Sequence, residues 1–265
     1  MSEMNKREKV KEQYSNDNKL SARINLHSKH STNEQGFYPW LFEKYEFHKS
    51  FRILELGCGN AAQWYGRIDD LPEDCILVLT DFSFGMVDAV WQKYSKYNNV
   101  LVQRVDIQDM PFPNEVFDII IANHMLYHIP DLDKALAEVK RVLKNDGRFY
   151  ASTNGNGGMR PYLHDALKRF NPEIDSFKTE LLFTMQNGEK TLHKFFDDVK
   201  LVEFEDSLRI TETQDLVDWI KSTITFASFS ESDLDGLFEF FEEIRIKEGT
   251  INIPKEMGLF ISRKS

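Results

Sequence analysis

Between residues 51 and 153 the chain alternates short apolar runs with amphipathic segments. Apolar runs typical of buried strands occupy residues 52–56, 75–79, 100–105, 117–122 and 148–153. Helices are predicted at residues 60–67, 83–97 and 131–144. Because strands and helices alternate, we expect a mostly parallel sheet with right-handed crossovers.

Two of these predicted helices have a clear apolar face. In the segment 83–97 that face consists of Met86, Val87, Val90 and Tyr94. In the segment 131–144 it consists of Leu132, Leu136, Val139 and Leu143. Asp131 is suited to cap the start of the second helix, and Gly147 to close its end.

After Thr153 the pattern changes. Residues 154–158 are rich in glycine and asparagine and predict a flexible break, and residues 159–199 predict irregular helix with a turn at Asn187-Gly188. Residues 200–210 and 257–263 alternate like strands, and residues 213–222 and 233–248 are predicted helices. We therefore expect a Rossmann-like α/β fold: a seven-stranded, mostly parallel sheet with helices on both faces and the last strand antiparallel.

The whole chain, 1–265, is predicted to be a single domain. Residues 51–153 form its core, residues 154–199 an insertion that acts as a lid, and residues 200–265 the completion of the sheet. Residues 1–50 form an N-terminal cap, in which residues 6–14 are a possible short helix. The cap ends in an apolar, aromatic cluster made of Phe37, Tyr38, Trp40, Leu41 and Phe42.

Charge and composition narrow the function classes. The 265 residues include 43 Asp and Glu against 33 Lys and Arg, and the net charge of −10 opposes binding to nucleic-acid phosphates. Apolar residues make up 41%, which excludes disorder along the whole chain. The two cysteines, Cys58 and Cys75, are typical of a reducing compartment. No signal peptide or membrane-spanning run is visible, so we expect a cytoplasmic protein that binds neither nucleic acid nor membrane.

The strongest candidate site is the turn after the first predicted strand, where Gly57-Cys58-Gly59 precedes a predicted helix. Glycines there permit a sharp turn and let a ligand lie against the backbone. Glu55 lies two residues earlier in an otherwise apolar strand. A buried carboxylate needs a partner, and it would repel the pyrophosphate of a dinucleotide but suit a ligand that carries an ammonium group. The alternative is a glutamate that reaches solvent from the strand end.

Acidic residues also end the second and third predicted strands. Asp81 follows Gly59 by 22 residues and can accept hydrogen bonds from both hydroxyls of a ribose. Asp106 can accept from an adenine amino group, with Ile107 and Met86 against the ring and Phe82 touching the adenosine. Each acid alone is compatible with an ordinary loop residue. Three carboxylates at the same edge of a parallel sheet favour a ligand site.

These motifs resemble the class I S-adenosylmethionine-dependent methyltransferases. The similarity covers residues 53–153 and rests on the segments LELGCGNAAQW, LVLTDFS, VQRVDIQDMPFPNEVFDIIIANHMLYHIPD and AEVKRVLKNDGRFYAST. The chain is most similar to the small-molecule branch related to ubiquinone and menaquinone biosynthesis methyltransferases. The resemblance implies S-adenosyl-L-methionine as cofactor, with Glu55 near its methionine end, Asp81 on the ribose, Asp106 on the adenine and Asn123 near the sulfonium. The full expected cofactor-binding set is Glu55, Gly57, Cys58, Gly59, Asp81, Phe82, Ser83, Met86, Asp106, Ile107 and Asn123.

Candidate catalytic residues follow the fourth predicted strand. His124 and His128, with Tyr127 between them, lie at the sheet edge where ligands bind in open α/β folds. A histidine there can take a proton from a hydroxyl or an amine, although each can also simply hold a loop carbonyl. The N-P-P-Y tetrapeptide of DNA and protein N-methyltransferases is absent, because Asn123 is followed by His-Met-Leu. No metal-binding motif is visible, and His27, His30 and His48 are scattered.

We therefore expect an enzyme that transfers a methyl group from S-adenosyl-L-methionine to a small-molecule acceptor. Its pocket is expected to be partly apolar and lined by aromatic residues of the cap and the lid, which are Tyr14, Phe37, Tyr38, Trp40, Phe170, Phe177 and Phe183. Two alternatives stay open: a non-catalytic protein that binds S-adenosylmethionine or S-adenosylhomocysteine, and an NAD(P)-dependent oxidoreductase. The accepting atom and the oligomeric state do not follow from the sequence.

Overall fold

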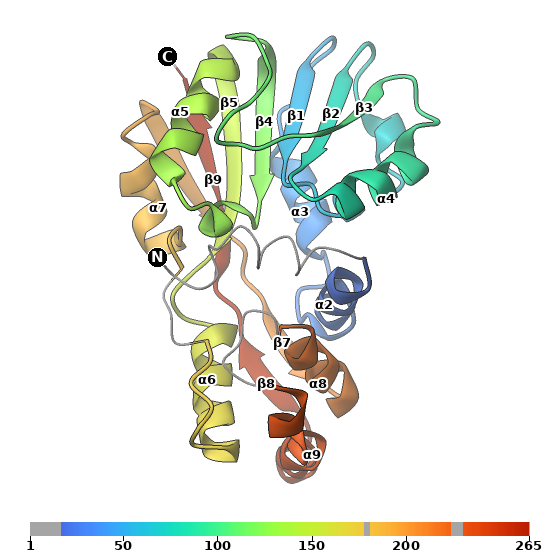
Figure 1. Cartoon of the computed structure of the whole chain (residues 1–265), viewed down its shortest axis with the longest axis vertical. Coiled ribbons are helices and arrows are strands. Elements are labelled where there is room, and N and C mark those ends of the chain that lie inside the picture. Colours follow the sequence, from blue (N-terminus) through green and yellow to red (C-terminus); the bar gives the residue numbers. More distant parts are fainter. Residues whose placement is uncertain (1–16, 178–180, 224–229, 265) are drawn as a thin grey trace.

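The computed structural model describes residues 17–177, 181–223 and 230–264. A seven-stranded sheet in the order β3-β2-β1-β4-β5-β9-β6 forms the larger part of the molecule (Figure 1). The strands of this sheet are β1 (Arg52–Leu56), β2 (Ile76–Asp81), β3 (Val100–Arg104), β4 (Phe117–Asn123), β5 (Leu143–Asn154), β6 (Asp198–Glu203) and β9 (Met257–Arg263).

The first five strands are parallel, and β9 lies antiparallel between β5 and β6. The predicted fold class and the antiparallel last strand are therefore confirmed. Because β1 to β5 are parallel, their carboxyl ends meet at one edge, and Figure 1 shows this edge facing the lower part of the molecule. Side chains that follow these strands are thereby brought together.

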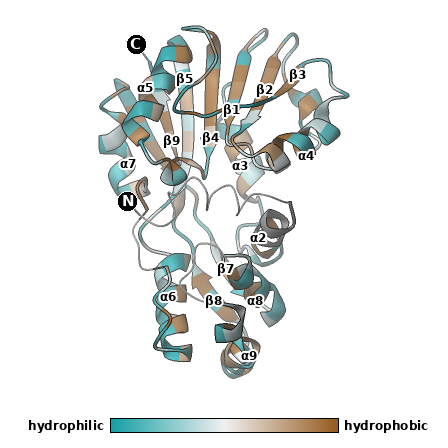
Figure 2. Cartoon of the chain, in the orientation of Figure 1, coloured by the Kyte–Doolittle hydropathy of each residue, from teal (hydrophilic) through white to brown (hydrophobic). Residues whose placement is uncertain are grey.

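Helices cover both faces of the sheet. Successive side chains of a strand point to opposite faces, so each face of these apolar strands needs a cover. In β1, Leu54 and Leu56 pack on one face with α5 (Leu132–Val142), while Ile53 packs on the other face with α3 (Phe37–Lys44) and α4 (Phe84–Tyr94). A further helix, α7 (Met185–Leu192), packs on β6 and β9. Figure 2 shows the central strands as hydrophobic and the outward surface of the covering helices as largely hydrophilic.

The remaining elements form what we call the second lobe, which lies below the sheet in Figure 1. It has its own apolar core, to which Leu26, Leu163, Leu208, Ile220 and Phe241 contribute. The elements of the second lobe are α2 (Asp17–His30), α6 (Met159–Phe170), β7 (Ser207–Ile210), α8 (Thr213–Ser222), η6 (Glu231–Leu234), α9 (Leu237–Glu248) and β8 (Ile251–Pro254). Strands β7 and β8 pair with each other in a separate two-stranded sheet.

Several sequence predictions about local structure are wrong. Residues 60–67 form only a 3-10 turn, η2 (Ala62–Trp64), because Ala61 and Gly66 both have positive φ. A second turn, η3 (Ile68–Asp70), follows. Residues 200–210 are not one strand, since β6 ends at Glu203 and β7 belongs to the second lobe. Residues 200–265 therefore complete the sheet only through β6 and β9.

Two glycines were also assigned wrongly. Gly147 does not close α5, which ends at Val142 with the backbone already extended at Leu143; Gly147 lies inside β5. Asn187-Gly188 is not a turn but part of α7. A Cβ at Gly188 would lie 2.3 Å from the ring of Phe260, so the close packing of α7 on β9 requires a glycine.

Smaller differences concern helix ends and the N-terminal segment. Helix α4 ends at Tyr94 rather than at residue 97, and Val87 is only half-buried on it. The predicted helix 233–248 is split by Gly236, whose φ of 82° separates η6 from α9. The predicted helix at residues 6–14, and Tyr14 with it, lies outside the described residues. None of the described helices combines the length and the apolar character that a membrane-spanning segment needs.

Candidate active site

A cavity of about 1000 Å³ lies between the carboxyl edge of the sheet and the second lobe. Most of the residues predicted for the site line it: Glu55, Gly57, Cys58, Gly59, Asp81, Phe82, Asp106, Ile107, Asn123, His124, Tyr127 and His128. Ser83 and Met86 do not. Ser83 instead occupies the N-cap position of α4. Met86 is fully buried within the fold, so the expectation that Met86 packs against a bound ring finds no support.

The glycine turn after β1 has the tight geometry that its sequence predicts. Gly57 and Gly59 have φ values of 62° and 56°, a region that favours glycine. A Cβ at Gly57 would also lie 3.0 Å from the side chain of Met125. The backbone N–H of Cys58 donates to the carbonyl of Thr80 at 2.8 Å, which ties the turn to the end of β2. The turn therefore presents bare backbone to the cavity.

Asp81, at the end of β2, joins the glycine turn to the loop that follows β2. Its Oδ2 accepts a hydrogen bond from the Gly59 backbone N–H at 2.9 Å, and its Oδ1 accepts one from the Ser83 backbone N–H at 2.8 Å. Burial raises the pKa of Asp81, while these backbone donors oppose the shift. Each carboxylate oxygen has a second acceptor position. Asp81 can thus hold the glycine turn and still accept hydrogen bonds from a ligand.

Glu55 is buried in β1 and is held by two neighbouring side chains. Its Oε1 accepts from Gln63 Nε2 and its Oε2 accepts from Trp64 Nε1, both at 2.5 Å. Burial raises the pKa of Glu55 to about 7, against the effect of these two donors. The carboxylate therefore has partners within the fold that the sequence analysis missed. Both partners follow from the short turn η2, which places residues 63 and 64 beside β1 in place of a regular helix.

Asn123 ends β4 and belongs to the same polar network. Its Nδ2 donates to Gln63 Oε1 and to the hydroxyl of Tyr45, each at 2.9 Å. Its Oδ1 is buried and has no hydrogen-bond partner among the described residues. Because a buried acceptor without a partner is costly, this oxygen is an observation in favour of a bound donor. Burial raises the pKa of Tyr45, so its hydroxyl stays protonated near neutral pH.

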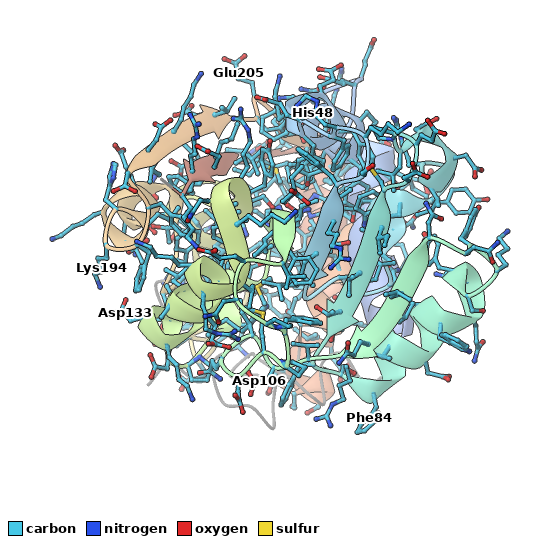
Figure 3. The ribbon with its side chains drawn as sticks, turned by 90° about the horizontal axis from the view of Figure 1, so that it is seen from above. His48, Phe84, Asp106, Asp133, Lys194 and Glu205 are labelled. Atoms are coloured by element: carbon cyan, nitrogen blue, oxygen red, sulfur yellow. The ribbon has the colours of Figure 1, made fainter. Side chains whose placement is uncertain are left out.

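Asp106 and Ile107 lie in the loop after β3. Asp106 Oδ1 accepts hydrogen bonds from the Gln108 backbone N–H at 3.0 Å and from Gln108 Nε2 at 3.2 Å. In the view from above in Figure 3, Asp106 and Phe84 are labelled near the lower edge of the molecule and His48 near its upper edge. Asp81 and Asp106 thus reach one cavity from neighbouring strands, as the sheet order requires.

His124 and His128 both reach the cavity from the segment after β4. His124 has a φ of 50°, and its ring packs 5.1 Å from the ring of Phe37. Burial lowers the pKa of His124 to about 4, with a further contribution from the charge of Lys255. His128 is buried, and its ring makes an edge contact with Tyr127 at 4.6 Å. His124 is therefore neutral at physiological pH and can accept a hydrogen bond.

The predicted aromatic lining is only partly observed. Phe37, Tyr38 and Phe177 line the cavity. Trp40 and Phe183 are core residues, and Phe170 packs on the core of the second lobe. The segment 159–199 likewise divides, because α6 joins the second lobe while α7 covers the sheet.

Sequence reasoning missed several residues of the opposite wall of the cavity. His27, Met159, Arg160, Trp219 and Lys255 line it from the second lobe and its connections to the sheet. They are far apart in the sequence and follow no local pattern, so only the tertiary structure brings them together. No group of three or more His, Cys, Asp or Glu side chains in the described part of the chain has a geometry that could hold a metal ion.

Residues 54–151 match a family model described as a methyltransferase domain. The chain is 33% identical over 104 residues to an uncharacterized methyltransferase of Bacillus subtilis, which covers 39% of this chain and 41% of the relative. It is 29% identical over 105 residues to a ubiquinone/menaquinone biosynthesis C-methyltransferase of Francisella tularensis, covering 38% and 42%. A solved structure of Haemonchus contortus phosphoethanolamine N-methyltransferase 2, described as a complex with S-adenosyl-L-methionine, matches with a TM-score of 0.60. It is 19% identical and covers 94% of this chain and 57% of that one.

The fold is shared with solved methyltransferase structures, and the sequence match to a methyltransferase domain lies in the part of the chain that forms the parallel strands. Residues 54–151 match the methyltransferase domain model, and the chain is similar over this region to the ubiquinone/menaquinone biosynthesis C-methyltransferases. The chain spans about two fifths of the length of these two curated relatives. The family match spans the glycine turn and the parallel strands β1 to β5, and it does not include β6, β9 or the second lobe.

Proposed function

We propose that this protein is an S-adenosyl-L-methionine-dependent methyltransferase that acts on a small-molecule acceptor. The observation that carries the proposal is one cavity of about 1000 Å³ into which the glycine turn, Glu55, Asp81, Asp106 and Asn123 all open. This volume is at the upper end of the range of about 300–1,000 Å³ found for ligand pockets. It leaves room for an acceptor beside a cofactor.

The residues present fit the cofactor. Asp81 offers acceptor positions for two ribose hydroxyls, and Asp106 for an adenine amino group. Glu55 and the buried Oδ1 of Asn123 supply acceptors for an ammonium group. Gln63 and Trp64 hold the Glu55 carboxylate in place, and Tyr45 and Gln63 hold the Asn123 amide. The polar network at the ends of β1 and β4 is therefore arranged before a ligand binds.

The bound cofactor supplies an activated methyl group on a sulfonium. The chain's own contribution is to position the acceptor and to exclude water, which in well-aligned systems lowers a barrier by about 7–11 kcal/mol. Phe37 and Tyr38 of α3 close the cavity above His124 and keep the acceptor side apolar. A neutral His124 can accept a hydrogen bond from an acceptor hydroxyl or amine, although its low pKa makes it a weak base.

The assignment of His124 or His128 as a general base rests on their position alone. We propose to test it with His124→Gln and His128→Gln, measuring donor binding and turnover separately. A base contributes about 10²–10⁴-fold to the rate, so loss of turnover by that factor with unchanged donor binding supports the role. Turnover that survives both changes limits the two histidines to positioning the acceptor.

The function itself is tested by calorimetry with S-adenosyl-L-methionine, S-adenosylhomocysteine and NAD⁺, followed by labelling of metabolite extracts with isotopically labelled donor. We expect the two S-adenosyl compounds to bind and NAD⁺ not to bind. Binding without labelling of any small molecule would favour a non-catalytic binding protein, and labelling of RNA, DNA or protein alone would overturn the substrate class. Neither the described structure nor the comparisons favour these alternatives or an oxidoreductase. A cytoplasmic location and the lack of nucleic-acid partners stay predictions, and the net charge of −10 supports the second.

A further inference from the structure

The cavity does not end at the sheet but continues into the second lobe. Its far wall contains Met159 and Arg160 of α6, Trp219 of α8, and Phe177 and Leu181 from the connection between α6 and α7. None of these residues is among the expected cofactor contacts. The methyl acceptor is therefore the natural occupant of this part of the cavity, on the basis of the proposed function.

Aromatic rings give the far wall flat surfaces. The rings of Phe177 and Trp219 lie 6.1 Å apart with an angle of 34° between their planes. The guanidinium of Arg160 lies 5.6 Å from the centre of the Phe177 ring, within the range of a cation–π contact. The apolar or aromatic part of a ligand can pack against such a wall, beside the guanidinium of Arg160.

The polar atoms of the far wall call for a hydrogen-bond acceptor. Trp219 Nε1 is buried and has no hydrogen-bond partner among the described residues, and an indole N–H can only donate. Arg160 also only donates, and its guanidinium has five N–H groups, enough to hold more than one partner. A ligand that satisfies this wall must therefore bring acceptor atoms.

The buried cation on this side of the cavity is paired with a buried carboxylate. Lys255 lines the cavity with its side chain 7% exposed, and it is ion-paired with Asp206. Burial and the charge of Lys255 together lower the pKa of His27 to about 3 and that of His124 to about 4. The acidic groups Glu34 and Asp175 lie at the exposed rim, where Asp175 is 3.6 Å from Lys168.

We propose that the second lobe forms the acceptor site and that it binds a small carboxylic acid with an aromatic or apolar body, whose carboxylate contacts Arg160 and Trp219 Nε1. A planar carboxylate matches the fork of a guanidinium, and its second oxygen can accept from the indole N–H. The body of the acid packs on Phe177 and extends toward His124, where methyl transfer takes place.

Calorimetry tests whether the protein binds a carboxylic acid more tightly than the matching primary amide, a difference that we call the acid preference. The acids are benzoate, 4-hydroxybenzoate, indole-3-acetate and octanoate, and the affinity of each is compared with that of its primary amide. The protein is saturated with S-adenosylhomocysteine. We expect at least one acid to bind about tenfold or more tightly than its amide, because the guanidinium pairs with a carboxylate and not with an amide. Arg160→Gln is expected to remove this preference, and Arg160→Lys to retain part of it.

Two further variants separate the indole N–H from general damage to the lobe. Trp219→Phe keeps an aromatic ring but removes the donor, and we expect it to weaken acid binding about three- to tenfold. Arg209→Gln, an exposed arginine on β7 of the same lobe, is the matched control and is expected to leave acid binding unchanged. Melting temperatures of all variants report whether they are folded.

The inference is overturned if no acid in the panel binds more tightly than its amide, or if Arg160→Gln leaves the preference intact. Failure of the proposed function is a different result, since S-adenosylhomocysteine would then not bind to the wild-type protein. In that case the acid preference can still be measured in the absence of S-adenosylhomocysteine. The two ideas therefore fail in separable measurements.

Discussion

The sheet and the second lobe present opposite chemistry to the cavity between them. The sheet edge contributes carboxylates at the ends of three successive strands, Glu55, Asp81 and Asp106, together with exposed backbone at the glycine turn. The second lobe contributes aromatic rings, a buried indole N–H and the cation of Arg160. The matched family sequence covers only the first set. Under the proposed function, the sheet edge holds the cofactor and the second lobe holds the acceptor.

The largest effect is expected on the free energy of unfolding, from a substitution in the core of the second lobe alone. Phe241 on α9 is fully buried in the core of that lobe, and Phe241→Ala should cost about 3–5 kcal/mol of unfolding free energy. Since no expected cofactor contact lies in this lobe, affinity for S-adenosylhomocysteine should stay within about threefold, as the expected contacts supply that binding energy. Urea unfolding and calorimetry measure the two quantities.

The matched control on the same helix is Phe238→Ala, since Phe238 is 38% exposed. It should change stability by about 0.5 kcal/mol or less. Cofactor binding that falls in parallel with stability in Phe241→Ala would show that the two halves do not act independently.

On the sheet side, Asp81→Ala should weaken binding of S-adenosylhomocysteine by about 1.5–3 kcal/mol, the scale of hydrogen bonds to a charged group. Part of this loss arises because the Gly59 N–H loses its acceptor and the glycine turn loosens. Asp88→Ala, at an exposed position on α4, is the control and should bind normally. Unchanged affinity in Asp81→Ala would remove the ribose assignment.

The raised pKa of Glu55 predicts how the affinity for the cofactor depends on pH. Burial raises its pKa to about 7 in the free protein, whereas a bound ammonium group favours the carboxylate and lowers that pKa. Binding must therefore release a proton at acidic pH, and affinity should rise roughly tenfold between pH 6 and pH 8. His27 and His124 do not interfere, because their pKa values of about 3 and 4 keep them neutral across this range.

Calorimetry across this pH range in wild type and in Glu55→Gln measures the effect. The substituted side chain does not titrate, so its binding curve should be flat with pH. An equal pH dependence in both proteins would assign the titration to another group.

The smallest effect is expected at Tyr45, which does not line the cavity but holds the side chain of Asn123. Tyr45→Phe removes the hydroxyl that accepts from Asn123 Nδ2, and should cost about 0.5–1.5 kcal/mol of stability. Affinity for S-adenosylhomocysteine should fall only about two- to threefold, because Gln63 still holds the amide. Thermal unfolding and calorimetry test this, and a loss as large as that of Asp81→Ala would mean that Tyr45 orders the site directly.

The parts of the molecule that could be predicted are those governed by local periodicity. The five parallel strands, the cap at Asp131 and the shared edge of the three acids follow from apolar runs and from the rule that parallel strands end together. The antiparallel last strand at Met257–Arg263 was also predicted correctly.

What could not be predicted depends on tertiary contacts. Gly188 lies in a helix because Phe260 leaves no room for a side chain, and nothing near residue 188 in the sequence reveals that contact. The partners of Glu55 depended on a strained turn at Ala61 that replaced the predicted helix. The far wall of the cavity joins residues 27, 160, 219 and 255, which no sequence window contains.

The antiparallel strand β9 has a consequence for synthesis of the chain on the ribosome. Among the described strands, β6 pairs only with β9 in the main sheet, and β9 also covers the edge of β5. Neither contact exists until residues 257–263 have been translated. Until then the nascent chain exposes an unpaired, apolar strand edge at residues 148–154, which is a site for aggregation. Truncation before Met257 should therefore yield a product that depends on chaperones, even though the glycine turn and its acids are already complete.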